Sequence, residues 1–375
     1  MQEKQQEFSF VYSVVRSLFS FNLYVLFLVL AFCSFYSAQE SFSYDYIFYI
    51  GYFDAIQKMQ LEDIFFSLQS NLPFIYVSIP PSGLLEVGFV LFVRALFFIT
   101  ESPELVYALI ATISLMTRVF IMRRLGINWA WIVLINIYAI TLFEANAIRA
   151  GCALTLIIFG GYCLLKDRKL IGFALLVSST AFHVQAAFVF CFFCFFWLFY
   201  NFFNQSALKL ALTGIGLGVS GLVVDKALAL LNVSKMEDYS GKYVASVGIN
   251  SISMAGILLV GVFFYKVVSS RKYVLESMDL EGRTLLPFLI SSVPALSALV
   301  FATSLGAIGD RLWQFSFVVF SVFMLRVRIR DDFRYILYLL LFLCLFISNI
   351  NVLIRYPLSN FLYPLVPYID IVPKF

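Results

Sequence analysis

Charged residues are scarce in this chain. Asp, Glu, Lys and Arg together make up 13% of its 375 residues, about half the share of a soluble globular protein, which is roughly 25%. Hydrophobic residues make up 62%, so the chain has too little polar material to cover a soluble surface. The net charge of +4 is small and spread over many loops, which argues against nucleic acid as a partner. The scarcity of charge therefore excludes a soluble domain.

Histidine is almost absent as well. His183 is the only one, which excludes a metal site built from several imidazoles. The six cysteines lie in apolar segments or at their ends, and the pair Cys191 and Cys194 is embedded in Phe and Trp. This pattern favours packing cysteines over a redox pair. No small-x-small cleavage site follows the first apolar block, so we expect that block to be retained as a helix.

The abundant apolar residues fall in blocks of membrane-spanning length, where about 20 residues cross the hydrocarbon. The blocks are continuous rather than alternating, which favours helices over a barrel. We therefore predict an all-α fold, a polytopic transmembrane bundle of about 12 helices that forms one membrane domain over residues 1–375. The expected helices run over about 18–36, 84–100, 104–122, 129–143, 150–165, 170–182, 184–203, 207–231, 251–268, 285–305, 312–325 and 333–348.

Three longer segments separate or follow these helices. Residues 37–83 are polar and aromatic, 232–250 form a loop, and 351–375 form a Pro- and Tyr-rich tail. We expect the first two to face the periplasm. The Pro80-Pro81 pair and the mixed polarity around it predict a re-entrant or interfacial piece near residues 64–81. The charge pattern leaves the topology of residues 37–104 and the side of the N-terminus open.

Basic residues gather in alternate loops, which the positive-inside rule places in the cytoplasm. The other loops then face outward, and they hold isolated polar residues instead. The basic loops contain Arg118, Arg123 and Arg124; Lys166, Arg168 and Lys169; Lys209; Lys266, Arg271, Lys272 and Arg283; and Arg326, Arg328, Arg330 and Arg334.

Isolated ionisable groups in or at the ends of membrane helices are costly and are therefore candidate functional groups. Glu144, Asn146 and Arg149 interrupt an apolar run at the outward turn between the fourth and fifth expected helices. Asn146 and Arg149 are three residues apart and could share a helix face. The structural alternative is a helix cap in which Glu144 pairs with Arg149. Arg118 is expected to snorkel to an interface.

His183, Asp45 and Glu86 are candidate acid–base groups. A neutral imidazole at His183 would be a proton acceptor near pH 7, and an interfacial hydrogen-bonded histidine is the alternative. Asp45 lies in a tyrosine-rich stretch. Glu86 opens the second expected helix, where an acid is favourable even without a further role.

Further candidates are cationic or aromatic. Arg311 follows Asp310, which could simply neutralise it, and Tyr239 and Lys242 lie in the loop 232–250. Aromatic and cationic side chains suit a sugar that carries an anion, and arginine suits bidentate contacts with phosphate. A lipid-anchored diphosphate is the natural anion at that depth.

In layout the chain resembles the Wzy-type O-antigen polymerases and the EpsG-type exopolysaccharide polymerases of bacterial envelopes. The resemblance rests on an ordered set of short motifs spread over most of the chain. These are Tyr44-Asp45-Tyr46, Glu86-x-Gly88, Asn146-x-x-Arg149-x-x-x-Ala153, Phe182-His183 and the isolated Arg311.

The resemblance implies a multi-pass enzyme of the bacterial inner membrane, with an active-site cavity that faces the periplasm. Such enzymes move a growing glycan from undecaprenyl diphosphate onto a new lipid-linked repeat unit, and a flippase and a chain-length regulator would be partners. Arg149 and Arg311 would stabilise the departing diphosphate. His183 would be the base, with Asp45 or Glu86 as second choices. No cofactor or metal is required, and Asp45 leaves a metal open.

Two other classes stay open. One is another membrane glycosyltransferase, such as an O-antigen ligase or an enzyme that uses polyprenyl-phosphate sugars. The other is a lipid-linked oligosaccharide flippase, in which internal repeats and polar residues near mid-membrane are expected. No repeat is apparent and the lone charges fall at helix ends, which favours an enzyme that works at one membrane face.

Overall fold

The computed structural model describes residues 24–26, 28–29, 31–32, 46–64, 76–79, 83–144, 147–203, 209, 212–217, 259–261, 263, 280–294, 306–326 and 333–355. Most of these residues are helical. The helices are α2 (Tyr46–Lys58), α4 (Val87–Leu96), α5 (Pro103–Arg124), α6 (Trp129–Ala139), α7 (Ile148–Leu165), α8 (Lys169–Thr180), α9 (Val184–Phe202), α13 (Leu280–Ile290), α15 (Gly306–Met324) and α16 (Phe333–Arg355). A π-helix, η1 (Ile140–Glu144), continues α6, and the strands β1 (Tyr76–Ile79) and β2 (Gly83–Glu86) complete the described elements.

Three of the described helices are long and apolar enough to cross a membrane. They cover Pro103–Arg124, Ile148–Leu165 and Gln185–Phe202, that is, α5, α7 and nearly all of α9. Their bounds agree within a few residues with the helices expected at 104–122, 150–165 and 184–203. The fold is that of a helical membrane protein. The helices expected at 207–231 and 251–268 lie largely outside the described residues.

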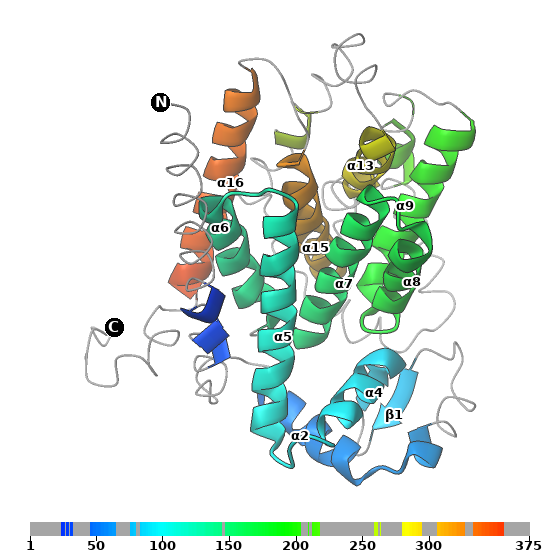
Figure 1. Ribbon diagram of the computed structural model, residues 1–375, viewed down its shortest axis with the longest axis vertical. Helices are drawn as coiled ribbons and strands as arrows, with labels where there is room; N and C mark the ends of the chain where they lie inside the picture. The colour runs from blue at the N-terminus through cyan, green and yellow to red at the C-terminus, as the bar shows by residue number, and fades with distance from the viewer. Residues whose placement is uncertain are drawn as a thin grey trace, which may run out of the picture.

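Helix α7 lies among α5, α8, α13 and α15 in the bundle (Figure 1). Small residues bring α7 and α8 close together, since a Cβ placed on Gly172 would lie 3.0 Å from the carbonyl oxygen of Gly160. Aromatic rings pack three other helices of the bundle together. The ring of Phe288 stacks on Phe193 at 4.0 Å and on Phe323 at 4.6 Å between centroids, which joins α13 to α9 and α15.

A β-hairpin corrects the all-α expectation locally. β1 and β2 pair antiparallel, with Tyr76 opposite Glu86 and Val77 opposite Leu85. Val77 and Leu85 are buried, and Ser78 is exposed, so side chains alternate between two faces as a strand requires. The sequence pattern missed the hairpin because short apolar runs do not separate strand from helix. The re-entrant piece expected near 64–81 includes β1, and its Pro80-Pro81 pair lies outside the described residues.

The second expected helix is also shorter than the sequence indicated. It was placed at about 84–100, but β2 continues through Glu86 and α4 covers only 10 residues, Val87–Leu96. At 1.5 Å per residue such a helix is about 15 Å long, roughly half the hydrocarbon thickness. α4 alone therefore does not cross a bilayer, and the chain reaches α5 from the same end at which the hairpin lies.

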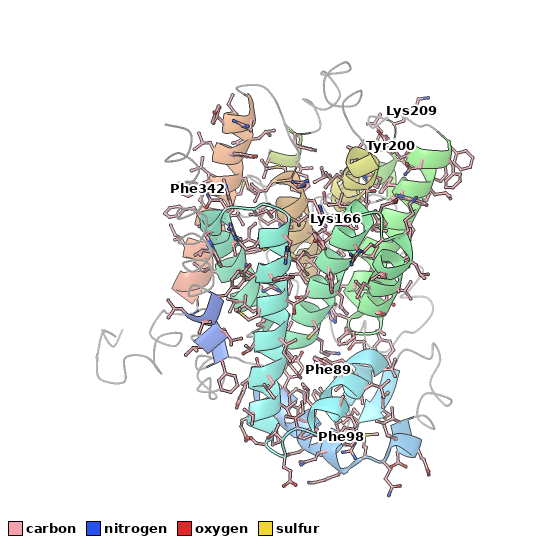
Figure 2. All side chains as sticks on the ribbon, in the orientation of Figure 1. Phe89, Phe98, Lys166, Tyr200, Lys209 and Phe342 are labelled. Atoms are coloured by element: carbon pink, nitrogen blue, oxygen red, sulfur yellow. The ribbon has the colours of Figure 1, made fainter. Side chains whose placement is uncertain are left out.

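The hairpin, α2 and α4 gather at one end of the molecule, beside the first residues of α5 (Figure 1). We call this group the end lobe. Figure 2 shows Phe89 and Phe98 in the end lobe, and Lys166 and Lys209 toward the opposite end of the bundle. Lys166 directly follows α7. α7 has 18 residues, so at 1.5 Å per residue its two ends lie about 27 Å apart.

Candidate active site

Three of the residues singled out in the sequence meet where the end lobe joins the bundle. Glu86 is the last residue of β2, Arg149 lies in the first turn of α7, and His183 immediately precedes α9. Glu86 is 63 residues from Arg149 and 97 residues from His183 along the chain. The fold therefore assembles this cluster, the Glu86–Arg149–His183 site, from three separate motifs.

One carboxylate holds the other two groups. Glu86 Oε2 accepts a hydrogen bond from Arg149 Nη1, which makes an ion pair. Its second oxygen, Oε1, lies 3.3 Å from His183 Nδ1. The Glu86 side chain is only 2% exposed, whereas that of Arg149 is 23% exposed. Of the two side chains, that of Arg149 is therefore the more exposed.

The electrostatics fix the charge on Glu86. Burial raises the pKa of its carboxyl, but the hydrogen bond with His183 and the positive charge of Arg149 outweigh burial and hold the pKa at about 2. Glu86 is therefore ionised at neutral pH, and an ionised carboxylate only accepts hydrogen bonds. In the tautomer that donates from His183 Nδ1 to this carboxylate, Nε2 carries the lone pair of the ring.

Two tyrosines that the sequence analysis did not single out surround this cluster. Arg149 Nε donates to the Tyr49 hydroxyl at 3.3 Å, and the guanidinium carbon lies 6.0 Å from the Tyr49 ring centroid. Tyr76 lies opposite Glu86 in the hairpin and is half-buried. Burial raises the pKa of Tyr76, and the nearby charge of Glu86 raises it further. The tyrosine-rich composition of residues 44–52 was the only signal for Tyr49.

Gly88 explains why two of the short motifs come together. Its backbone N–H donates to the Ala181 carbonyl oxygen at 2.8 Å, at the turn that follows α8. A Cβ on Gly88 would lie 2.8 Å from that oxygen and 2.9 Å from the Ala181 Cβ, so only glycine fits without a shift. The rings of Phe92 and Phe182 pack beside this contact, with centroids 5.8 Å apart. The Glu-x-Gly motif is thereby docked onto the Phe-His motif.

Several expectations about ion pairing are corrected. Glu144 does not pair with Arg149; its carboxylate binds Arg118 in a bidentate ion pair with distances of 2.8 and 3.0 Å. Arg118 does not snorkel, because its side chain is fully buried against this carboxylate. Glu86 stands at the residue before α4 but makes no capping hydrogen bond with its side chain. Arg118 lies in α5 and Glu144 in η1, so no local sequence pattern predicts that they pair.

The remaining candidates are not tested by the geometry. Asp45, Asn146, Tyr239 and Lys242 lie outside the described residues. Arg311 was expected just before a helix at 312–325, but α15 begins at Gly306, so Arg311 lies inside the helix. The structure describes the backbone of Arg311 but not its side chain. Among the described residues no group of three or more His, Cys, Asp or Glu side chains could hold a metal ion. The open metal role of Asp45 stays a prediction.

The likeness to known proteins is found at the level of the family. No curated protein and no solved structure shows a significant match to the chain. A family model, described as the EpsG family, matches residues 10–369. This match covers nearly the whole chain and all the motifs described above. The chain therefore belongs to the EpsG family, which is consistent with a membrane protein of the polysaccharide-polymerase type.

Proposed function

We propose that this protein is a polysaccharide polymerase of the bacterial inner membrane, with its active site open to the periplasm. It transfers a growing glycan from undecaprenyl diphosphate to a new lipid-linked repeat unit. The observation that supports this proposal best is the Glu86–Arg149–His183 site. A partly exposed cation and an imidazole with a free lone pair lie within reach of one carboxylate, at one end of an apolar bundle.

Arg149 is the proposed contact for the diphosphate. Its planar guanidinium can bind two phosphate oxygens at once, and positive charge there stabilises the negative charge that develops on the leaving group. Arg311 is the proposed second cation. Asn146, Tyr239 and Lys242 are proposed to contact the diphosphate or the sugar that carries it.

His183 is the proposed general base. The acceptor sugar hydroxyl attacks the anomeric carbon of the growing glycan, and the bond from that carbon to the diphosphate oxygen breaks. Undecaprenyl diphosphate leaves with the bonding electron pair, and the hydroxyl proton passes to His183 Nε2 and then to water. Glu86 orients the imidazole through Nδ1 and stabilises the imidazolium that forms, as the acid does in Ser-His-Asp triads. Asp45 is the alternative base.

A flippase is the second candidate, because one ionic contact lies well inside the bundle. Arg118 and Glu144 are both fully buried among α5, η1 and α7, and polar groups at such depth are typical of transporters. Their bidentate pairing favours a fixed structural element over a carrier site that must exchange partners. An O-antigen ligase would use a similar site but would transfer the glycan to a different acceptor.

The test is a pair of substitutions at Arg149, assayed as extension of lipid-linked repeat units by the purified protein. Arg149→Ala should reduce extension at least ~100-fold, the usual scale for loss of one transition-state contact. Arg149→Lys should be partly active, because a point charge replaces a planar fork. Lys169→Ala is the control, since Lys169 is exposed at the far end of α7 and α8.

A deletion strain separates the candidate classes. Loss of the polysaccharide ladder with one repeat unit retained supports the polymerase. Loss of every unit supports the flippase or the ligase. Normal extension by Arg149→Ala would show that the site is misplaced.

A further inference from the structure

A second polar cluster lies inside the bundle, and the proposed reaction does not use it. Arg118 of α5 pairs with Glu144 at the end of η1 through two hydrogen bonds. Arg118 Nε also donates to Asn136 Oδ1 at 2.7 Å. Ser114 Oγ donates to Glu144 Oε1 at 3.1 Å and lies 2.9 Å from Thr155 Oγ1 of α7. All five side chains are buried, so this buried network ties α5, α6, η1 and α7 together.

The buried network reaches Arg149 through the chain itself. Glu144 is five residues before Arg149, and near them Ala147 N donates a hydrogen bond to Phe143 O at 2.7 Å. Gly151 lies against the Glu144 carboxylate, since a Cβ on Gly151 would be 2.8 Å from Glu144 Oε1. The first turn of α7, which carries Arg149, is therefore packed directly onto the ion pair.

A second route runs through two tyrosines. The Tyr107 hydroxyl donates to the carbonyl oxygen of Glu144 at 2.7 Å. The Tyr107 ring packs on Tyr49, with centroids 6.3 Å apart, and Tyr49 accepts the hydrogen bond from Arg149 Nε. The first route thus reaches the carboxylate of Glu144, and the second reaches its main-chain carbonyl, so both routes from Arg149 converge on the residue that pairs with Arg118.

We propose that the Arg118–Glu144 pair is a positioning element, which holds the guanidinium fork of Arg149 in the orientation that binds the diphosphate. This inference rests on the proposed function of Arg149. The π-helical geometry of residues Ile140–Glu144 agrees with it, because π-helical turns occur frequently at functional sites. Positioning of this kind matters because a misplacement of about 1 Å can slow a reaction ~100-fold.

Stability alone is a weak reason for such a pair. Removing two charges from water is expensive, and replacing a buried ion pair by apolar side chains of similar volume is often neutral or stabilising. Removing one partner is instead strongly destabilising, because it leaves an unpaired buried charge. Variants that remove both charges together therefore separate a positioning role from a stabilising one.

The experiment is a mutant cycle on the purified full-length protein. The pair is replaced in the double variant Arg118→Met/Glu144→Met, and the same double change is made in the Arg149→Lys background. Thr112→Val is the control, because Thr112 is buried in α5 and its hydroxyl has no hydrogen-bond partner among the residues that the structure describes. For each protein, kcat for extension of lipid-linked repeat units, binding of undecaprenyl diphosphate and the Tm are measured.

We expect the double variant to keep the wild-type Tm within a few degrees but to lose at least ~10-fold in kcat and in affinity for undecaprenyl diphosphate. In the Arg149→Lys background the same change should have less than a ~2-fold effect, because a flexible ammonium does not depend on the orientation of a fork. Thr112→Val should behave as the wild type. Equal losses in both backgrounds, or no loss in either, would overturn the proposal.

Arg118→Lys keeps the inference testable if the double variant fails to accumulate. It keeps one ionic contact with Glu144 but loses the fork and the contact with Asn136. Its losses in kcat and in affinity for undecaprenyl diphosphate should likewise be smaller in the Arg149→Lys background. Failure of the proposed function looks different. In that case Arg149→Ala itself extends normally, whatever the pair does.

Discussion

At the scale of single residues, the site is organised around a shared carboxylate. Glu86 pairs with Arg149 through one carboxylate oxygen and contacts His183 Nδ1 through the other. In the proposed reaction, an arriving diphosphate carries more negative charge than Glu86 and would compete with it for the guanidinium. Glu86 would then remain beside His183 and stabilise the imidazolium formed during transfer. Substitutions at His183 and Glu86 separate these two roles.

His183→Gln tests the base. Glutamine can still donate a hydrogen bond to Glu86, but it cannot take up a proton near neutral pH. We expect the purified variant to bind lipid-linked repeat units normally and to extend them at least ~100-fold more slowly. Steady-state extension together with equilibrium binding gives both quantities. Near-normal extension would move the base role to Asp45 or Glu86.

Glu86→Gln tests the charge balance through the pH dependence of stability. The pKa of Glu86 is lowered from 4.5 to about 2 in the folded protein. Its ionised form therefore stabilises the fold above about pH 4.5, by ~3 kcal/mol. This contribution is lost as the pH falls from about 4.5 toward 2.

We expect the wild type to exceed Glu86→Gln in Tm at pH 7, and the gap to narrow as the pH falls below 4.5. Thermal unfolding of both proteins in detergent, over a series of pH values, measures the gap. Glu101→Gln, which removes an exposed carboxylate just before α5, should show no such dependence. A gap that stays constant down to pH 3 would contradict the assigned ion pair.

At the scale of elements, the sequence predicted the long helices well and the joints between them poorly. α5, α7, α8 and α9 end within a few residues of their expected bounds, because long continuous apolar runs have few alternatives in a membrane. The hairpin was missed since its strands have only four residues each. The partners of Arg118 and Arg149 were missed because pairing between elements far apart in the sequence depends on packing that no local pattern encodes.

The contact between Gly88 and Ala181 gives a prediction at this scale. Gly88→Ala places a methyl group against the Ala181 backbone and must push α4 away from the turn before His183. We expect extension to fall at least ~10-fold, since Glu86 and His183 move apart. Gly51→Ala is the matched control, because a Cβ at Gly51 in α2 meets no atom of the described part of the chain within 4 Å and alanine favours a helix. Equal activity of the two variants would show that the contact is not needed.

At the scale of the whole molecule, the Glu86–Arg149–His183 site and a cluster of basic residues lie at opposite ends of α7. Glu86, Arg149 and His183 lie beside the end lobe, whereas Lys166, Arg168 and Lys169 lie in the turn at the other end of α7. α5 likewise begins beside the end lobe and ends at Arg123 and Arg124. If the basic turns face the cytoplasm, the site faces outward, where lipid-linked repeat units would meet.

Cysteine labelling tests this orientation in intact cells. In a background without the native cysteines, Glu101→Cys, just before α5, should react with a membrane-impermeant maleimide from outside. Arg168→Cys, in the turn after α7, should react only after the membrane is permeabilised. The two positions lie at opposite ends of the spanning helices α5 and α7. In intact cells the impermeant reagent should therefore label only one of them. Labelling of Arg168→Cys from outside would place the Glu86–Arg149–His183 site in the cytoplasm, where a periplasmic polymerase could not use it.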